Sequence, residues 1–232
     1  MVWRQKEDMM RNVRSVAIAV LLALAALLDL GARFAGAAGV DDPLDPAAER
    51  HIRDFRNAWL GASAPGPRGE VVGWPTYSGI GWSIQYPREW TIREANEQFL
   101  WATNPSGTAA FIIANAARLP GLPSAEELRD IVVSRLLGGG PARLIAAERK
   151  RIAQVPQTGD DTGVMSLYIL RRQDPSGELT LCSIQITILS RGPLGTDYQC
   201  FVQSCPERRW VETWKQVFDP MIVSAQFISW WW

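Results

Sequence analysis

The stretch of residues 164–190, VMSLYILRRQDPSGELTLCSIQITILS, holds two apolar runs on either side of a short polar segment. The segment between them, Asp174-Pro175-Ser176-Gly177, has the residue types of a tight β-turn. From Cys182 to Ile188 every second residue is apolar, which places those side chains on one face of a strand. The stretch therefore predicts a β-hairpin of two long strands.

More strands are expected around this hairpin. They cover residues 81–86, 90–92, 99–103, 109–116, about 144–155 and 198–202. Residues 109–116 are apolar except for Asn115, which indicates a strand near the middle of the sheet. Strands that follow one another in hairpins, with few helices between them, predict an α+β fold with a central antiparallel β-sheet flanked by helices.

Three helices are expected in addition. Ile52, Phe55 and Trp59 have helical spacing within a short amphipathic helix, which Asp45 can cap. Ser124, followed three residues later by Glu127, forms a capping box at the start of a second helix. A third helix covers about residues 207–218, with Trp210, Val211, Trp214, Val217 and Phe218 as its apolar stripe.

Composition and charge limit the possible partners. The chain has 232 residues, 47% of them apolar and 21% charged, which suits one globular domain and a targeting segment. Without residues 1–37 it keeps 19 basic and 21 acidic residues, a net charge of −2. Nucleic-acid binding is therefore disfavoured, because it depends on a clustered basic face. The expected organisation is a targeting segment over residues 1–37, a linker with the first helix over 38–69, and an α+β domain over 70–232.

Residues 1–37 have the pattern of an export segment. Basic residues precede an apolar run from Val16 to Leu28, whose helix would rise about 20 Å, short of the roughly 30 Å hydrocarbon core. Ala35-Gly36-Ala37 supplies the small side chains that a signal peptidase requires, so cleavage is expected before Ala38. An uncleaved membrane anchor is the alternative. Either outcome predicts a periplasmic or extracellular protein.

Four short motifs resemble a known superfamily. In chain order they are Trp82-x-Ile84-x-Tyr86-Pro87-x-x-Trp90, the turn Asn104-Pro105-x-Gly107, the helix start Pro123-Ser124-Ala125-Glu126-Glu127-Leu128, and the closing segment Ile222-Val223-Ser224-Ala225-Gln226-Phe227. Together they span about residues 74–228 and resemble PsbP-like domains of the PsbP and Mog-type superfamily, which includes secreted bacterial members. The resemblance implies an α/β/α sandwich and a non-enzymatic protein that binds protein partners or small ligands, often beside a membrane complex.

The sequence shows no catalytic, cofactor-binding or metal-binding motif. Its single histidine, His51, falls on the first helix and is expected on a solvated face. Residues 138–140 are three glycines, which are expected to end a helix. They do not form a phosphate loop, because the residues that follow them supply no lysine. The turn at residues 159–163 carries Asp160 and Asp161, which could hold calcium only weakly. We therefore expect no enzyme, no cofactor and no metal.

The three cysteines are Cys182, Cys200 and Cys205. Export implies an oxidising environment, so a disulfide is expected. A hairpin that closes between Ser190 and Asp197 places Cys182 opposite Cys205, whereas period-two alternation places Cys182 and Cys200 on the same face. We expect the pair Cys182–Cys205, with three free thiols as the alternative.

Tryptophan is the compositional anomaly, with 11 copies, three of which are Trp230, Trp231 and Trp232. Tryptophan favours protein and membrane interfaces, so these three residues are the candidate docking surface. The first hypothesis is a non-catalytic extracytoplasmic accessory or binding protein that docks to a membrane protein complex or a membrane surface. The alternatives are a periplasmic carrier of a small apolar ligand and, last, an enzyme whose site is built from scattered polar residues.

Overall fold

A computed structural model describes residues 40–61, 69–119, 124–136, 142–153, 162–174, 176–190 and 196–227. Several predictions fall outside these residues: the export segment with Ala35 and Ala37, the glycines at 138–140, the Asp160-Asp161 turn, and Trp230, Trp231 and Trp232. They stay predictions. None of the helices in the described ranges is both long and apolar enough to cross a membrane.

The large sheet has seven antiparallel strands in the order β3-β4-β5-β9-β8-β7-β6. Their bounds are β3 Thr91–Asn96, β4 Phe99–Thr103, β5 Ala110–Leu119, β6 Ala142–Ala153, β7 Thr162–Gln173, β8 Leu179–Ser190 and β9 Thr196–Pro206. The predicted hairpin is β7–β8, and its turn is closed by Asp174, whose side chain accepts hydrogen bonds from the Ser176 and Glu178 amides. The predicted antiparallel α+β fold is confirmed.

A second, smaller sheet joins the two ends of the domain. It contains β1 (Thr76–Gly79), β2 (Trp82–Gln85) and β10 (Gln226–Phe227), in the order β1-β2-β10. The Trp82 indole donates a hydrogen bond to the Glu97 carbonyl, 2.9 Å away, which ties this sheet to the β3–β4 turn. A side chain at Gly79 would meet the Trp82 ring at 2.2 Å, so only glycine fits this approach.

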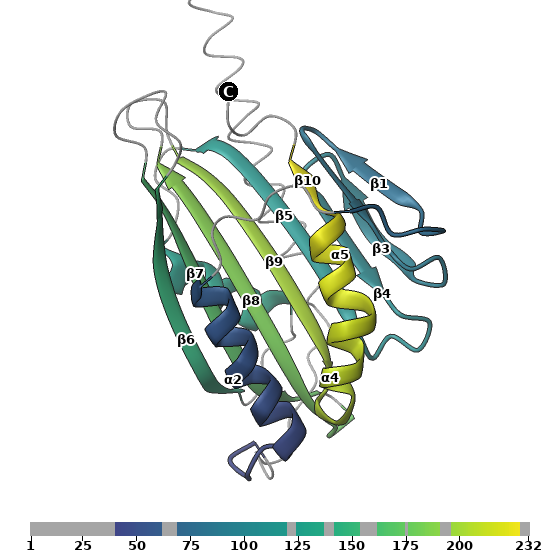
Figure 1. Ribbon diagram of the computed structural model, residues 1–232, viewed down its shortest axis with the longest axis vertical. Coiled ribbons are helices and arrows are strands. Elements are labelled where there is room, and N and C mark those ends of the chain that lie inside the picture. Colours follow the sequence, from purple (N-terminus) through teal and green to yellow (C-terminus); the bar gives the residue numbers. More distant parts are fainter. Residues whose placement is uncertain are drawn as a thin grey trace, which may run out of the picture.

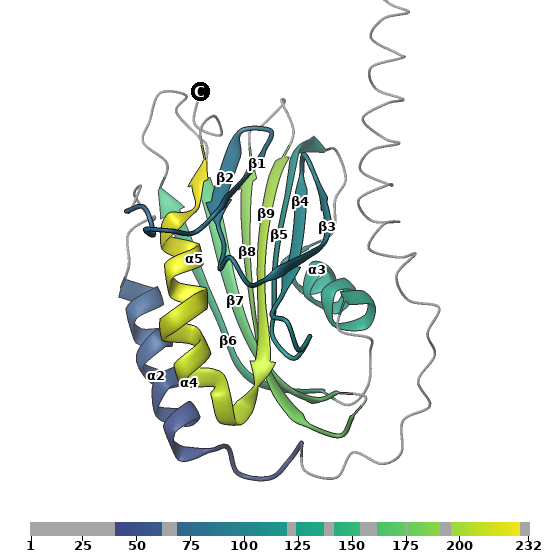
Figure 2. The ribbon, with the colours of Figure 1, turned by 90° about the vertical axis from the view of Figure 1, so that its right-hand side faces the viewer.

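Helices cover both faces of the large sheet, as Figures 1 and 2 show. One face lies under α2 (Pro46–Gly61) and a C-terminal helical segment made of the turn Glu207–Arg209, α4 (Trp210–Thr213), the π-helical turn Trp214–Phe218 and α5 (Asp219–Ser224). We call it the two-helix face. The opposite face lies under α3 (Ala125–Ile131) and its π-helical continuation Val132–Leu136, and we call it the α3 face. The result is an α/β/α sandwich.

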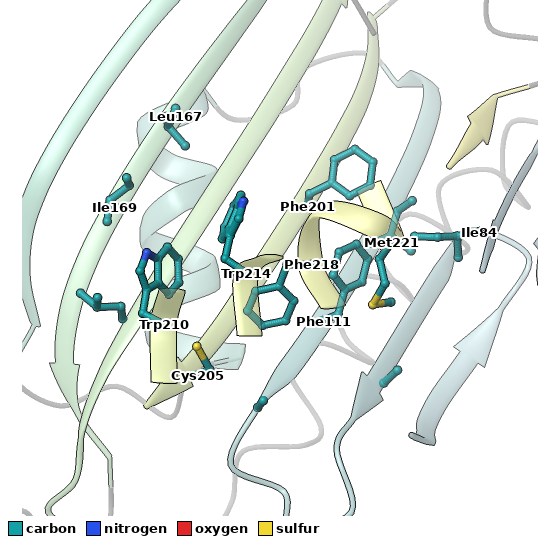
Figure 3. Packing of buried hydrophobic residues seen from close by; sticks show 14 of the residues in the cluster. Ile84, Phe111, Leu167, Ile169, Phe201, Cys205, Trp210, Trp214, Phe218 and Met221 are labelled. Carbon is teal, nitrogen blue, oxygen red and sulfur yellow. The ribbon is translucent and has the colours of Figure 1, made fainter. Parts of the chain in front are cut away.

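Aromatic side chains fill the two-helix face. Trp210, Trp214, Phe218 and Met221 follow one another at helical spacing along the C-terminal segment, and all are buried. Figure 3 shows them above the strands, near Leu167, Phe201 and Phe111. The Phe218 ring lies 6.4 Å from that of Phe111 and 6.2 Å from that of Trp90, so the predicted apolar stripe of this helix is confirmed.

The α3 face is mainly aliphatic, with Phe99 and Tyr168 as its buried aromatic side chains. Ile184, Ile186 and Val202 are buried there with Cys182, against Ala125 and Val132 of the helix. The predicted capping box is present, because Ser124 Oγ accepts from the Glu127 amide at 3.2 Å and Glu127 Oε2 accepts from the Ser124 amide at 2.7 Å.

The first helix is an integral part of this core, although the sequence placed it in a linker. Ala48, Ile52 and Trp59 are buried in the same apolar cluster as the sheet, and the Phe55 ring lies 4.4 Å from that of Trp214. Asp45 caps the helix, since its carboxylate accepts from the amides of Ala47 and Ala48. The sequence periodicity predicted the apolar stripe of this helix correctly, but it did not predict that the stripe packs against the large sheet.

A buried ion pair fixes the chain in front of this helix. Arg171 of β7 and Glu207 are 3% and 7% exposed, and the guanidinium group donates to the Glu207 carboxylate at 2.6 and 3.2 Å. The remaining Arg171 donors bind the carbonyls of Val40, Asp42 and Pro43. Glu207 also accepts from the Asp45 amide at 2.7 Å. We call this group of contacts, together with Arg143, whose side chain donates to the Asp41 carbonyl at 3.0 Å, the N-terminal clamp.

The predicted disulfide Cys182–Cys205 is wrong, because all three cysteines are free thiols. In the β8–β9 register, Cys182 lies opposite Ser204, and Cys205 lies opposite Leu181. The pairing is shifted by one residue from the predicted one, so Cys182 belongs to the α3 face and Cys205 to the two-helix face. Burial raises the pKa of each of the three thiols to about 12, which leaves them unreactive near neutral pH.

Breaking the N-terminal clamp should strongly destabilise the fold. Arg171→Met leaves the Glu207 carboxylate buried without its cation, and we expect a loss of about 3–5 kcal/mol in the free energy of unfolding. Arg208→Met removes an ion pair to Glu178 in which Arg208 is 79% exposed, and should change stability by no more than about 1 kcal/mol. Urea unfolding followed by circular dichroism measures both. Equal effects of the two substitutions would contradict the central role of the clamp.

Candidate functional site

A group of polar side chains lies on the two-helix face, where the neighbouring positions are apolar. It consists of Asn115 on β5, Ser183, Gln185 and Thr187 on β8, and Gln199 and Gln203 on β9. We call it the polar patch. Alternation along each strand puts these residues on the same face as Leu181 and Phe201, which belong to the core under the helices.

The strand register arranges the patch in three rows across the sheet. In the first row Ser183 pairs with Gln203. In the second row Gln185 pairs with Phe201. In the third row Gln199 lies between Thr187 and Asn115, its partners on either side. Neighbouring strands are about 4.8 Å apart, and the four steps from Ser183 to Thr187 span about 13 Å. The patch therefore extends about 13 Å along β8 and reaches across three neighbouring strands.

Most of the patch is deeply buried and incompletely hydrogen-bonded. Ser183 and Gln203 are 0% exposed, and Asn115 is 2% exposed. Asn115 Nδ2 and Oδ1, Ser183 Oγ and Gln203 Nε2 have no hydrogen-bond partner within the described structure. Within the patch, Gln185 Nε2 donates a side-chain hydrogen bond to Gln203 Oε1 at 3.5 Å. A buried polar group without a partner costs about 1–3 kcal/mol. Six further atoms of this kind lie elsewhere among the described residues, Trp59 Nε1, Ser166 Oγ and Trp210 Nε1 among them.

Burial decreases toward one end of the patch. Thr187 and Gln199 are half-buried, whereas Ser183 and Gln203 are closed off. In Figure 1, α2 and the C-terminal helical segment lie closest together at α4 and diverge toward β10, with β8 and β9 between them. The Thr187–Gln199 row belongs to the halves of β8 and β9 that lie away from α4.

His51 occupies the place where the two helices meet. Its ring lies 6.4 Å from Trp210 and 6.0 Å from Trp214, and its Nδ1 is buried with no partner in the described part of the chain. The side chain is half-buried rather than fully solvated as predicted, because α2 turns it toward the tryptophans. Burial lowers the pKa of His51, and nearby Lys215 lowers it further, against smaller opposing effects of Asp54 and Asp219.

Sequence reasoning missed the polar patch, although a signal for it was present. Ser183, Gln185 and Thr187 alternate with the isoleucines of β8, a pattern that normally indicates a solvent-exposed face. The structure shows that helices cover both faces, so the same alternation instead puts polar groups into a covered layer. Among the described residues, no group of three or more His, Cys, Asp or Glu side chains is placed to hold a metal ion.

Protonation of His51 should weaken the packing of α2. Because the folded-state pKa lies below the ordinary value near 6.5, the unfolded chain binds a proton first as the pH falls. The free energy of unfolding should therefore be greatest above about pH 6.5 and should fall as the pH drops below it. Denaturant titrations between pH 8 and pH 5 should show a smaller fall in the His51→Gln variant. An identical pH profile in both proteins would rule out this role, since the chain has one histidine.

Comparison with known proteins gives a limited likeness. No protein-family model matches the chain, and no curated protein matches it. The solved structures similar to it include the Ran-binding protein Mog1p of Saccharomyces cerevisiae, with 9% identity over 68% of this chain and 97% of that one, at a TM-score of 0.37. A point mutant of Mog1 gives 10% identity, the same coverages and a TM-score of 0.36. A likeness at this level carries no argument about activity, ligand or partner.

Proposed function

We propose that the protein is a non-catalytic, extracytoplasmic binding protein that works beside a membrane, docked to a membrane protein complex or to the membrane surface. The observation that carries this proposal is the N-terminal clamp. It holds the chain directly behind the predicted export segment and thereby couples that segment to the folded domain.

Only a short stretch of chain separates the predicted export segment from Val40, where the chain joins the folded domain. Val40 is 3% exposed, and its carbonyl is bound by Arg171. Only Ala38 and Gly39 separate it from the expected cleavage site after Ala37. If the apolar run that ends at Leu28 stays in the membrane, the eleven residues between Leu28 and Val40 reach at most about 40 Å. An uncleaved protein would then keep its domain close to the bilayer surface.

The chemistry of the polar patch supports binding over catalysis. Its side chains are amides and hydroxyls, which form hydrogen bonds but do not exchange protons near neutral pH. General acid–base and nucleophilic catalysis need a titratable or activated group, and the pKa of the three thiols, about 12, makes them poor nucleophiles. Membership of the PsbP-like and Mog-type superfamily belongs to the same proposal and rests on the four sequence motifs.

A carrier of a small molecule is the second candidate, and the polar patch favours it. The sequence suggested an apolar ligand between sheet and helix. The half-buried hydroxyl of Thr187 and amide of Gln199 instead favour a ligand that forms hydrogen bonds.

Export and membrane attachment can be tested together in a bacterial host. We expect the full chain to be degraded by protease added to spheroplasts but not to intact cells, and to start at Ala38 on N-terminal sequencing. It should sediment with membranes and leave them in high salt if a partner or the surface holds it. Ala35→Leu with Ala37→Leu should block cleavage and make the attachment resistant to salt. Protection of the chain from protease in spheroplasts would contradict the proposal, because it would place the protein in the cytoplasm.

A further inference from the structure

We infer that the outer edge of β6 pairs with an extended, acidic segment of a partner protein, which adds a strand to the large sheet. The inference rests on the proposed function, because it names the surface through which this binding protein meets a partner. Strand β6 ends the sheet beyond β7, and Figure 1 shows it at the outer border of the molecule. Among the described residues, no backbone group outside β7 bonds to the backbone of β6. Its outward N–H and C=O groups form a template to which a strand of another chain can add.

The two edges of the sheet differ in how well they can accept a strand. β3 is six residues long, has a register irregularity between Ile92 and Glu94, and leads to Glu97, whose carbonyl accepts from the Ile80 amide of the small sheet at 2.8 Å. β6 is twelve residues long, and residues 146–153 pair with β7 without interruption. β6 is therefore the longer and more regular edge.

A small apolar side chain and two arginines lie beside this edge on the α3 face. Ala147 pairs with Tyr168 of that face, so Ala147, Arg149 and Arg151 project from it, and all three are exposed. Within the described ranges, neither arginine forms an ion pair with a carboxylate. A backbone hydrogen bond lowers the pKa of Glu126 on α3 most, and the charge of Arg149 adds to this effect. The α3 side of the edge is thus positively charged.

The opposite face of β6 is held by α2. Arg56 of this helix donates to the Glu148 carboxylate at 2.9 Å, and the Lys150 ammonium group lies 4.5 Å from the centre of the Trp59 ring. These contacts fix the side chains of β6 on the two-helix face. Selection of an added strand therefore falls to the α3 face, where Arg149 and Arg151 are exposed.

A second copy of this chain does not fit the edge. When two identical antiparallel strands pair about a two-fold axis, the residue on the axis faces its own counterpart. Every axis through residues 148–151 would place like charges opposite each other, because these residues are Glu148, Arg149, Lys150 and Arg151. Directly opposed like charges destabilise a pair of strands. β6 carries four basic residues and one acidic residue in a domain of net charge −2, so its charge selects an acidic partner.

The spacing of the two arginines specifies the partner segment further. Arg149 and Arg151 are about 7 Å apart along the strand, which is also the distance between every second side chain of an added strand. Carboxylates at two alternate positions would each meet one guanidinium group, and such a pair can form two parallel hydrogen bonds. The expected partner is therefore an extended segment with the pattern acidic-x-acidic.

Peptide binding to matched variants of the full chain tests the inference. The probe is the fluorescein-labelled peptide Thr-Val-Glu-Val-Glu-Val-Thr, and the control peptide has lysine in place of both glutamates. In fluorescence anisotropy, Arg149→Gln with Arg151→Gln should weaken binding of the acidic peptide at least about threefold, because two exposed ion pairs are lost. Arg208→Gln with Arg209→Gln removes the same charge from exposed positions outside β6 and should leave the affinity unchanged.

Strand addition also leaves a signature that electrostatic attraction alone does not. At saturating acidic peptide, every second amide of residues 146–153 should exchange its hydrogen more slowly, because alternate N–H groups of an edge strand point away from its neighbour. Two versions of the acidic peptide, N-methylated on alternate sets of amides, should differ. Only one of the two rows of N–H groups meets β6, so one version should bind and the other should not.

Four results would overturn the inference. The first is no binding of the acidic peptide. The second is equal binding of the lysine peptide, or binding that persists without Arg149 and Arg151. The third is slower exchange of the β6 amides with rising protein concentration alone, which would assign the edge to a second copy. The fourth is binding of phosphatidylglycerol vesicles through the two arginines without binding of the peptide, which would assign them to a membrane surface.

The inference and the proposed function fail separately. If the protein is exported and attached to membranes but does not bind the acidic peptide, only the role of β6 is lost. If it binds the peptide but stays in the cytoplasm, only the proposed location is lost.

Discussion

The ion pair between Arg171 and Glu207 is the contact on which the other parts of the domain depend. It connects β7 to the first turn after β9, and through the carbonyls of Val40, Asp42 and Pro43 it fixes the chain that enters α2. A buried ion pair is tolerated only when its remaining hydrogen-bonding groups are satisfied, and here backbone carbonyls and the Asp45 amide do this. The helix that covers half of the two-helix face is therefore held at its start by polar contacts and along its length by apolar ones.

The position of α2 in turn determines the surroundings of the polar patch. At α4 the helix packs His51 and Phe55 against the tryptophans of the C-terminal segment, and on the sheet below the Ser183–Gln203 row is fully buried. Farther along, the two helices diverge, and the Thr187–Gln199 row is half-buried. One face of the sheet thus combines a closed aromatic core with a hydrogen-bonding surface.

Local patterns predicted the elements well and their contacts poorly. The β7–β8 hairpin, the capping box at Ser124 and the apolar stripe of α2 all follow from residues close together in sequence. The clamp could not be predicted, because Arg171 and Glu207 are 36 residues apart and each looks like a surface charge. The β8–β9 register differs by one residue from the expected one, so Cys182 and Cys205 lie on opposite faces of the sheet and not on the same face. His51 and the polar patch were missed for a related reason, since helical cover on both faces is a tertiary property.

The central claim is that the N-terminal clamp makes residues 40–61 and the large sheet one cooperative unit. Native-state hydrogen exchange measures this most directly, because it gives a free energy of opening for each amide. If the claim holds, the interior amides of α2 open with the same free energy as those of β8, and both values fall together in Arg171→Met. Exchange of α2 at a clearly lower free energy than β8 in the unmodified protein would show that the helix detaches on its own and would contradict the account.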